Sequence, residues 1–269
     1  MQLVIQDICF SYGSCSVLKG VSMEVVPGQV LSIVGPNGCG KSTFLRCLAR
    51  VLKPQGGAVF FDGRETAQIS SRELARLLGY VPQAGAEVFP FTVLETVLMG
   101  RKPHLNWGVA QKDLDVVAQV MKFMGLDEMA QRPIEQLSGG QKQKVFIARA
   151  LAQEPQVFLF DEPTSSLDIR HQLEVLELVG ELARQKRCQV VMVLHDLNLA
   201  ARFSDRMVML KDGLVYAAGQ PGEVLTMENV SAVYGVEVSI AVSAVGHYVV
   251  PLRPVAAEHH PLRATAFKI

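Results

Sequence analysis

The chain has 269 residues, of which 49% are hydrophobic, so it can bury a substantial core in one or two subdomains. Lysine plus arginine equals aspartate plus glutamate at 26 each, so no basic excess indicates a nucleic acid or an acidic membrane surface as the partner. No apolar stretch approaches the roughly 18 residues of a membrane-spanning helix, the N-terminus lacks the charge pattern of a signal peptide, and the five cysteines show no metal-ligand spacing.

The N-terminal part of the chain carries the residue pattern of β-strands. The pairs Pro27-Gly28 and Asp62-Gly63 are typical of turns, and they lie beside runs rich in apolar residues. This pattern predicts an antiparallel sheet at the start of the chain. The expected strands are Leu3–Phe10, Val21–Val26, Val30–Val34 and Ala58–Asp62.

A glycine-rich loop follows Val30–Val34. Residues 35–43 read Gly-Pro-Asn-Gly-Cys-Gly-Lys-Ser-Thr and fill the pattern G-x-x-x-x-G-K-[ST]. Glycines permit a tight turn whose N–H groups point at phosphate oxygens, and the start of the expected helix Lys41–Leu52 adds positive charge. Lys41 is expected to reach the β- and γ-phosphates, and the Ser42 hydroxyl to bind Mg²⁺. A turn that merely caps a helix is the alternative, and the strand before the loop disfavours it.

This loop therefore predicts that the chain binds a nucleoside triphosphate. Its electropositive setting is expected to lower the pKa of the Cys39 thiol, to which we assign no catalytic role. The predicted phosphate-loop residues are Gly35, Pro36, Asn37, Gly38, Cys39, Gly40, Lys41, Ser42 and Thr43.

The centre of the chain has helical periodicity. Ser70, followed by Glu73 three residues later, has the pattern of a capped helix start. After Pro155 strands and helices alternate, which predicts a parallel core that carries a helical insertion. The expected helices are Thr92–Met99, Lys112–Met124, Gly139–Ala152, Arg170–Gln185 and Leu197–Phe203, and the expected strands are Val157–Phe160, Gln189–Leu194 and Arg206–Leu210.

Two acidic residues end the apolar run Val157–Phe160. Such a run suits a strand that is buried on both faces of a parallel sheet, with its carboxylates at the edge where ligands bind. Asp161 is expected to orient Mg²⁺ through its water shell, and Glu162 to polarise the attacking water. The alternative is a core strand that ends in a solvated acidic turn, and the preceding phosphate loop disfavours it.

A second short motif, Leu137-Ser138-Gly139-Gly140-Gln141, opens the helix that runs to Ala152. Ser138 is a suitable N-cap, and the two glycines leave bare backbone N–H groups at a positive helix end. Alone this pentapeptide could be any capped helix start. Its place in the order of the other motifs makes it informative.

That order of motifs resembles the ATP-binding-cassette (ABC) ATPases, from Tyr12 to about Gly235. The resemblance implies an α/β fold: a P-loop NTPase core with a mostly parallel sheet, an N-terminal antiparallel β subdomain and an inserted α-helical subdomain. We expect a nucleotide-binding domain over residues 1–255, with the helical subdomain at about 84–155, and a C-terminal tail over 256–269.

The same resemblance implies roles for particular residues. Tyr12 would stack on adenine, Gln83 would contact Mg²⁺ and sense the γ-phosphate, and His195 would touch the γ-phosphate and the water. Asp168 would face the opposite subunit, and the stretch Ser138–Gln141 would close on ATP bound to that subunit. The implied catalytic unit is a head-to-tail dimer with ATP and Mg²⁺. A Tyr12 that only covers a sheet edge and a His195 that is only a core residue are the alternatives.

The variable segments are similar to the ATPases of importers for iron–siderophore, haem and cobalamin. This narrower resemblance implies transmembrane permease subunits as partners and, indirectly, a solute-binding protein. The chain would then be peripheral on the cytoplasmic face of the cell membrane. Val88, Phe89 and Phe91 are expected to form a docking groove for a partner's helix, with plain core as the alternative. The similar segments are residues 71–76, 89–93, 99–104 and 168–176.

A second functional class remains open, namely a soluble ABC ATPase in DNA repair, translation or cofactor assembly. Members of that class usually carry two cassettes, long coiled-coil insertions or zinc motifs. The chain has one cassette, no heptad run and no CxxC pair, so transport is favoured over this alternative and no nucleic-acid partner is expected.

Overall fold

The structure is a computed structural model that describes residues 2–83, 90–165, 167–243 and 246–255. A six-stranded sheet, in the order β10-β9-β3-β8-β7-β6, forms its centre. All neighbouring strands in this sheet are parallel except β9 and β10, which are antiparallel. The strands are β3 (Val30–Val34), β6 (Leu78–Val81), β7 (Val157–Asp161), β8 (Gln189–Val193), β9 (Arg206–Lys211) and β10 (Leu214–Gly219).

The interior of this sheet is apolar on both faces, as the sequence pattern predicts for parallel strands. Every residue of β3, β7 and β8 is buried. Because these three strands are neighbours, their carboxyl ends lie together at one edge of the sheet. The loops that follow them are the phosphate loop, the segment that begins with Glu162 and the segment that begins with Leu194. The topology therefore gathers the candidate site residues at this edge.

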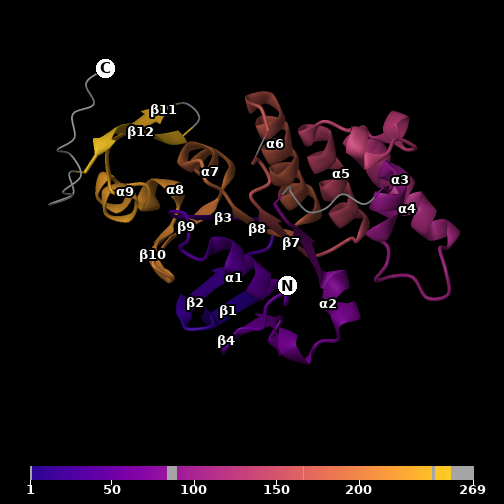
Figure 1. Ribbon diagram of the computed structural model, residues 1–269, viewed down its shortest axis with the longest axis horizontal. Helices are drawn as coiled ribbons and strands as arrows, with labels where there is room; N and C mark the ends of the chain where they lie inside the picture. Colours follow the sequence, from indigo (N-terminus) through magenta and orange to yellow (C-terminus); the bar gives the residue numbers. More distant parts are fainter. Residues whose placement is uncertain (1, 84–89, 166, 244–245, 256–269) are drawn as a thin grey trace, which may run out of the picture.

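A second, four-stranded antiparallel sheet lies at the N-terminal end of the chain, in the order β2-β1-β4-β5. One apolar cluster includes residues from both sheets and from helix α1 (Lys41–Leu48), so α1 packs between the two sheets (Figure 1). The strands are β1 (Leu3–Tyr12), β2 (Cys15–Val25), β4 (Gly56–Phe61) and β5 (Arg64–Glu65).

The helices between β6 and β8 form a layer on the other side of the parallel sheet (Figure 1). The helices are α3 (Val93–Met99), α4 (Gln111–Met124), α5 (Gly139–Ala152) and α6 (Ile169–Lys186), with 3₁₀ turns at Asp127–Met129 and Ile134–Gln136. Before them, α2 (Ser71–Leu77) follows a 3₁₀ turn at Thr66–Gln68, and the Ser70 hydroxyl accepts a hydrogen bond from the Glu73 N–H, as the capping pattern predicts.

A buried arginine joins three of these helices. Arg101 is 2% exposed, and it donates to Asp113 at 3.0 Å, to the Ala152 carbonyl at 2.6 Å and to Glu154 at 2.7 Å. Beside it, a Cβ on Gly100 would lie 2.1 Å from the Arg149 carbonyl oxygen, so only glycine permits this approach of α3 to α5. Part of the segment 99–104, which carries the narrower resemblance, thus has a packing role.

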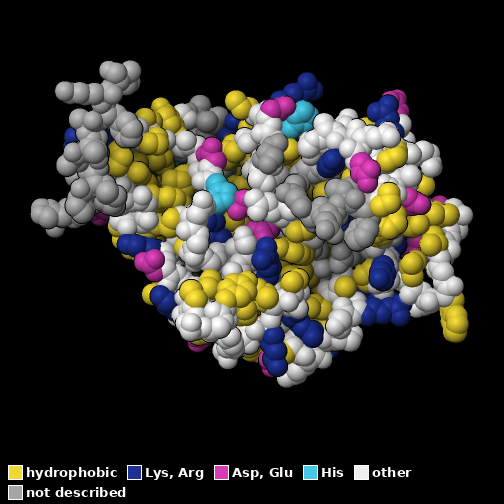
Figure 2. All heavy atoms as spheres, in the orientation of Figure 1, with side chains coloured by type: hydrophobic (Ala, Val, Ile, Leu, Met, Phe, Trp, Pro, Cys, Tyr) yellow, Lys and Arg dark blue, Asp and Glu magenta, His cyan; other side chains and the backbone are white. Residues whose placement is uncertain are grey.

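The C-terminal part adds α7 (Leu197–Phe203), α8 (Pro221–Val224), α9 (Met227–Tyr234) and the hairpin of β11 (Val236–Ser243) and β12 (Gly246–Pro254). The Asn198 side chain holds the hairpin to α7, because it donates to the Val249 carbonyl at 3.2 Å and accepts from the Val249 N–H at 2.6 Å. Apolar side chains gather on this part of the surface (Figure 2), and Val242 is 73% exposed.

The predicted fold class is confirmed: the chain is α/β, with a mostly parallel sheet, a separate antiparallel sheet and a helical layer. The expected helix Lys41–Leu52 was too long, because α1 ends at Leu48 and Arg50 adopts a left-handed conformation with φ of 55°. Strands β5, β6, β10, β11 and β12 and helices α8 and α9 were not anticipated. Val30–Val34, grouped above with the N-terminal antiparallel strands, lies instead in the central sheet as β3, parallel to β8 and β9. Among the described residues, no helix combines the length and apolar character needed to cross a membrane.

Candidate nucleotide-binding and hydrolysis site

The phosphate loop is a tight backbone cradle at the end of β3. A Cβ on Gly35 would lie 2.4 Å from the Leu210 carbonyl oxygen, a backbone atom, so this position requires glycine. Gly40 has φ of 102° at the N-terminus of α1, a conformation that favours glycine, and a Cβ there would also lie 2.8 Å from the Leu18 side chain. Lys41, only 5% exposed, folds back over the loop, and its ammonium group donates to the Gly35 and Pro36 carbonyls at 2.8 and 2.9 Å. The loop thus holds one positive charge beside its own backbone.

Asp161 is bonded on both carboxylate oxygens. Its Oδ1 accepts from the Ser42 hydroxyl at 2.8 Å, and its Oδ2 accepts from the Tyr80 hydroxyl at 3.1 Å. Burial and the neighbouring Asp161 charge raise the pKa of Tyr80 to about 12, so this hydroxyl stays a donor at neutral pH. Sequence reasoning assigned no role to Tyr80. The strand β6 that carries it was not predicted, and no local signal placed it next to β7.

Glu162 holds the central position of the site. Its Oε2 accepts a hydrogen bond from Gln83 Nε2 at 2.6 Å, and its Oε1 contacts His195 Nε2. The side chain is 11% exposed, whereas that of His195 is 45% exposed. Glu162 also has φ of 52°, a conformation that is uncommon for residues other than glycine and that clusters at functional sites.

The strand ends explain why these residues meet. The Glu162 N–H donates to the Val193 carbonyl at 3.2 Å, and the Leu194 N–H donates to the Ile33 carbonyl at 3.2 Å, so the ladder between β7, β8 and β3 continues up to the site. Asp196 then caps α7 by accepting from the N–H groups of residues 198 and 199. His195 is therefore held between a strand end and a capped helix.

A cavity of about 300 Å³ lies over the phosphate loop. Tyr12, which is 49% exposed, lies at its rim and packs edge-on against Phe10 with the ring centroids 4.8 Å apart. Near the middle of the molecular face drawn in Figure 2, histidine and acidic side chains lie close together. The lining residues are Tyr12, Val17, Asn37, Gly38, Gly40, Lys41, Ser42, Thr43, Glu162 and His195. Of these, sequence reasoning missed Val17, an ordinary strand residue with no motif around it.

The other predicted binding residues do not line this cavity. Gly35, Pro36 and Cys39 form the base of the loop. Ser138, Gly139, Gly140 and Gln141 open α5 in the helical layer, where Ser138 and Gln141 cap each other reciprocally: the Gln141 N–H donates to the Ser138 hydroxyl at 3.3 Å, and the Ser138 N–H donates to the Gln141 side chain at 3.0 Å. Asp168 caps α6 beside them. Neither the segment Ser138–Gln141 nor Asp168 is among the described residues that line the cavity over Lys41.

The expectation for Cys39 was wrong. Its thiol is 5% exposed, and burial raises its pKa despite the opposing charge of Lys41. Desolvation of the buried thiol exceeds the opposing attraction of Lys41 and the hydrogen bonds from nearby backbone N–H groups. This thiol is therefore protonated and unreactive at neutral pH.

The sequence of the chain matches the family model described as "ABC transporter" over residues 18–165. It is 45% identical to an uncharacterised ABC transporter ATP-binding protein, MJ0089, of Methanocaldococcus jannaschii, over 89% of this chain and 94% of that protein. It is 39% identical to the probable siderophore transport system ATP-binding protein YusV of Bacillus subtilis, over 87% of this chain and 86% of that protein. It is also 39% identical to the cobalamin import ATP-binding protein BtuD of Halobacterium salinarum, over 89% of this chain and 60% of that protein.

Solved structures agree with these matches. The solved structure described as "An inward-facing conformation of a putative metal-chelate type ABC transporter" superposes with a TM-score of 0.80 at 30% identity, covering 93% of this chain and 97% of that one. The cassette MJ0796, a dimer bound to ADP and phosphate in a post-hydrolysis state, superposes with a TM-score of 0.72 at 31% identity, covering 81% of this chain and 98% of that one. Fold and site together define an ATP-hydrolysing P-loop cassette. The chain belongs to the ABC transporter family.

Proposed function

We propose that this chain is the ATP-hydrolysing subunit of an importer for a metal chelate, an iron–siderophore, haem or cobalamin. For ATP hydrolysis, the supporting observation is the Glu162 carboxylate held between Gln83 and His195 beside the phosphate loop. For the cargo class, the support is the identity of 39% to siderophore and cobalamin import subunits over most of the chain.

In this proposal Glu162 is the general base that polarises the attacking water. Its two oxygens are oriented by Gln83 and His195, which leaves the carboxylate fixed but partly accessible. Lys41 exchanges the Gly35 and Pro36 carbonyls for the β- and γ-phosphate oxygens when ATP binds, and Tyr12 stacks on the adenine. The 300 Å³ cavity then holds the triphosphate over the start of α1.

The residues around Asp161 fit a bound Mg²⁺. The Ser42 hydroxyl and the Asp161 carboxylate are hard oxygen donors, already 2.8 Å apart, and the Tyr80 hydroxyl fixes the second carboxylate oxygen. Ser42, Asp161 and Gln83 are the residues that would hold the ion with its water shell. When bound, Mg²⁺ would neutralise charge on the phosphate oxygens.

The catalytic unit is proposed to be a head-to-tail dimer, because Ser138–Gln141 lies outside the cavity of its own chain and presents a helix N-terminus that suits a γ-phosphate. Each ATP would then lie between Lys41 of one copy and the Ser138 segment of the other. Asp168, beside that segment, faces the partner in this arrangement. The related cassette MJ0796 is dimeric.

Mixing two inactive variants tests this arrangement. Lys41→Ala removes the phosphate contact and Ser138→Arg blocks the helix start, so each homodimer should be inactive. A mixed dimer contains one intact composite site, and we expect activity to return. ATP turnover is measured against the mixing ratio, with mixed-dimer formation verified by two affinity tags. Mixed dimers that form but stay inactive would contradict the trans arrangement or show that both sites must act together.

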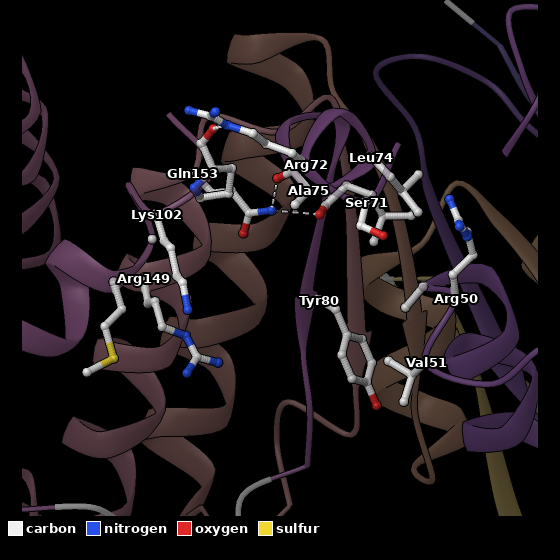
Figure 3. A pocket seen from close by; sticks show the side chains of 15 residues that line it. Arg50, Val51, Ser71, Arg72, Leu74, Ala75, Tyr80, Lys102, Arg149 and Gln153 are labelled. Carbon is white, nitrogen blue, oxygen red and sulfur yellow. Dashed lines mark hydrogen bonds between the residues drawn. The ribbon is translucent and has the colours of Figure 1, made fainter. Parts of the chain in front are cut away.

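The docking surface for a permease is proposed at a second cavity of about 740 Å³, between the core and the helical layer (Figure 3). Among the described residues that line it, four are cationic and none is a carboxylate, so it suits an acidic or neutral partner segment. The docking groove expected from the sequence, at Val88, Phe89 and Phe91, is a different place. Val88 and Phe89 are outside the described residues, and Phe91 is 36% exposed but does not line this cavity. The four cationic residues are Arg50, Arg72, Lys102 and Arg149.

Met99 lies in this cavity with 39% of its surface exposed. Met99→Glu places a carboxylate among the cationic residues of the cavity, where it would compete with an acidic partner segment for them and repel it, so we expect at least a tenfold loss of transport while the ATPase activity of the isolated subunit stays within about twofold. Met227→Glu is the matched control, because Met227 is 60% exposed on α9, away from the cavity. Equal transport by the two variants would refute the docking surface.

The cargo is tested by growth of a strain that lacks this gene. We expect loss of growth on one of siderophore-bound iron, haem or cobalamin as the sole source, restored by the wild-type gene but not by Glu162→Gln. Normal uptake of all three, with loss of a different solute, would overturn the cargo class and leave the ATPase assignment intact. Co-purification with a polytopic membrane protein in detergent would support a transporter subunit that is peripheral to the membrane and count against the soluble ATPase alternative.

A further inference from the structure

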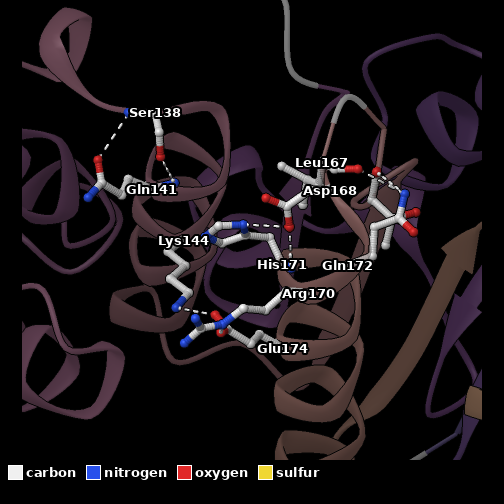
Figure 4. Close-up of polar contacts among 10 residues, drawn as sticks. Ser138, Gln141, Lys144, Leu167, Asp168, Arg170, His171, Gln172 and Glu174 are labelled. Carbon is white, nitrogen blue, oxygen red and sulfur yellow. Dashed lines mark hydrogen bonds and ion pairs between the residues drawn. The ribbon is translucent and has the colours of Figure 1, made fainter.

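The first turns of α5 and α6 lie side by side (Figure 4). Ser138 caps α5 and Asp168 caps α6, so both helix starts present capped backbone amides at the same place. In the proposed dimer, the first start covers the partner's ATP and the second faces the partner. His171, on the first turn of α6, is the side chain that lies between them.

His171 contacts both helix starts at once. Its Nδ1–H donates to Asp168 Oδ1 at 2.8 Å, and its backbone N–H donates to the same oxygen at 2.9 Å. Its ring lies against Gly140, where a Cβ would be 2.7 Å from Cδ2 and 2.9 Å from Cγ of the imidazole. Gly140 has no positive φ, so this position requires glycine because of the imidazole and not because of backbone conformation.

The start of α6 is also tied to the catalytic carboxylate of its own chain. The Gln172 side chain donates to the Leu167 carbonyl at 3.1 Å and to the Thr164 carbonyl at 3.4 Å. The Ser165 N–H and hydroxyl donate to the Glu162 carbonyl at 3.1 and 2.9 Å. Contacts therefore run from Glu162 through Ser165 and Thr164 to Gln172, the neighbour of His171 on the first turns of α6, and from His171 to Gly140.

A second contact between the two helices lies about one turn further on. Glu174 forms ion pairs with Lys144 at 2.8 Å and with Arg170 at 2.9 Å. These side chains are partly or largely exposed, and such pairs contribute little to stability. They attach α6 to α5 but touch neither Asp168 nor the signature glycines, so they provide a natural control for His171.

We propose that His171 is a positioning residue that sets the signature segment Ser138–Gln141 relative to Asp168 and the Glu162 segment. It thereby links the ATP site served by its own Glu162 to the site that its signature segment covers on the partner. This inference rests on the proposed head-to-tail dimer. A ring inserted between two helix starts transmits a shift of one to the other, because close-packed groups move together.

The experiment uses the full chain in a Glu162→Gln background, in which ATP should hold the dimer closed. His171→Asn retains a donor near Nδ1 and removes the ring from Gly140, whereas His171→Phe retains the ring and removes the donor. Dimerisation is followed by sedimentation against Mg·ATP concentration. Nucleotide affinity of the dilute monomer is measured with a fluorescent ATP analogue, and the unfolding midpoint is recorded for each variant.

Both His171 variants are expected to need at least tenfold more ATP to dimerise, with monomer affinity within about twofold and the unfolding midpoint little changed. Glu174→Gln should dimerise like its parent. Dimerisation of both His171 variants at the parent's ATP concentration would overturn the inference, and so would an equal defect in Glu174→Gln, which would show general helix attachment. If the Glu162→Gln parent does not dimerise with ATP, the proposed dimer itself fails and the inference with it.

Discussion

Glu162→Gln should lower ATP turnover by roughly 10²–10⁴ while ATP still binds. The structure gives the reason: the carboxylate is 11% exposed, and its oxygens meet Gln83 and His195, so a neutral amide of the same shape keeps its place but accepts a proton poorly. Without hydrolysis, ATP should hold two copies together. Turnover is measured by phosphate release, and molecular mass by light scattering with Mg·ATP.

Glu177→Gln is the matched control for this variant, since Glu177 is exposed on α6 and does not line the site cavity. It should hydrolyse ATP like the wild type and show no stabilised dimer. The role of Glu162 is refuted by wild-type turnover in Glu162→Gln. A variant that is inactive but remains monomeric with ATP would keep the catalytic role and count against the dimer.

Lys41→Ala should abolish hydrolysis and weaken triphosphate binding at least tenfold. Charge-assisted contacts of the kind Lys41 would make with phosphate oxygens contribute roughly 1.5–3 kcal/mol each. The ammonium group is already fixed by the Gly35 and Pro36 carbonyls beside the cavity, so little side-chain freedom is lost when ATP replaces them. Calorimetry with ATP and with ADP measures the effect, which should be larger for ATP.

Two checks accompany this variant. Removal of the ammonium also leaves the Gly35 carbonyl without the Lys41 donor, at a cost of about 1–3 kcal/mol if it stays buried, whereas the Pro36 carbonyl still accepts from the Cys39 N–H; the free energy of unfolding is therefore measured by urea titration. Lys112→Ala removes an exposed lysine of α4 and should change neither the ATP affinity nor the free energy of unfolding. An unchanged ATP affinity in the folded Lys41→Ala variant would contradict the assignment of residues 35–43 as a phosphate loop.

Local patterns were sufficient wherever function depends on contiguous residues. The loop 35–43 has glycine where its backbone turns and approaches Leu210 and Leu18, so the positions of the glycines in the sequence predict this tight turn. The same holds for the Ser138 and Ser70 caps and for the buried strand β7, since a cap or a both-faces-buried strand is decided by neighbouring residues.

What only the tertiary structure decided concerns residues far apart in the chain. The order of strands brings Tyr80 to Asp161, and it places His195 and Gln83 on either side of Glu162. No local pattern encodes which strand lies beside which. The φ of Glu162 and the direction of the Cys39 pKa shift likewise follow from the surrounding packing, because strain and desolvation depend on everything nearby.

The pentapeptide 137–141 shows both contributions at once. Its serine and glycines identify a helix start in the sequence, and the resemblance implied that this start serves the other subunit. Only the fold shows that it lies outside its own cavity and that His171 occupies the space above Gly140. A helix cap is a short-range interaction, so residues adjacent in the sequence are enough to predict it. The distance between two sites is set by the packing of the sheet and the helical layer, which depends on the whole chain.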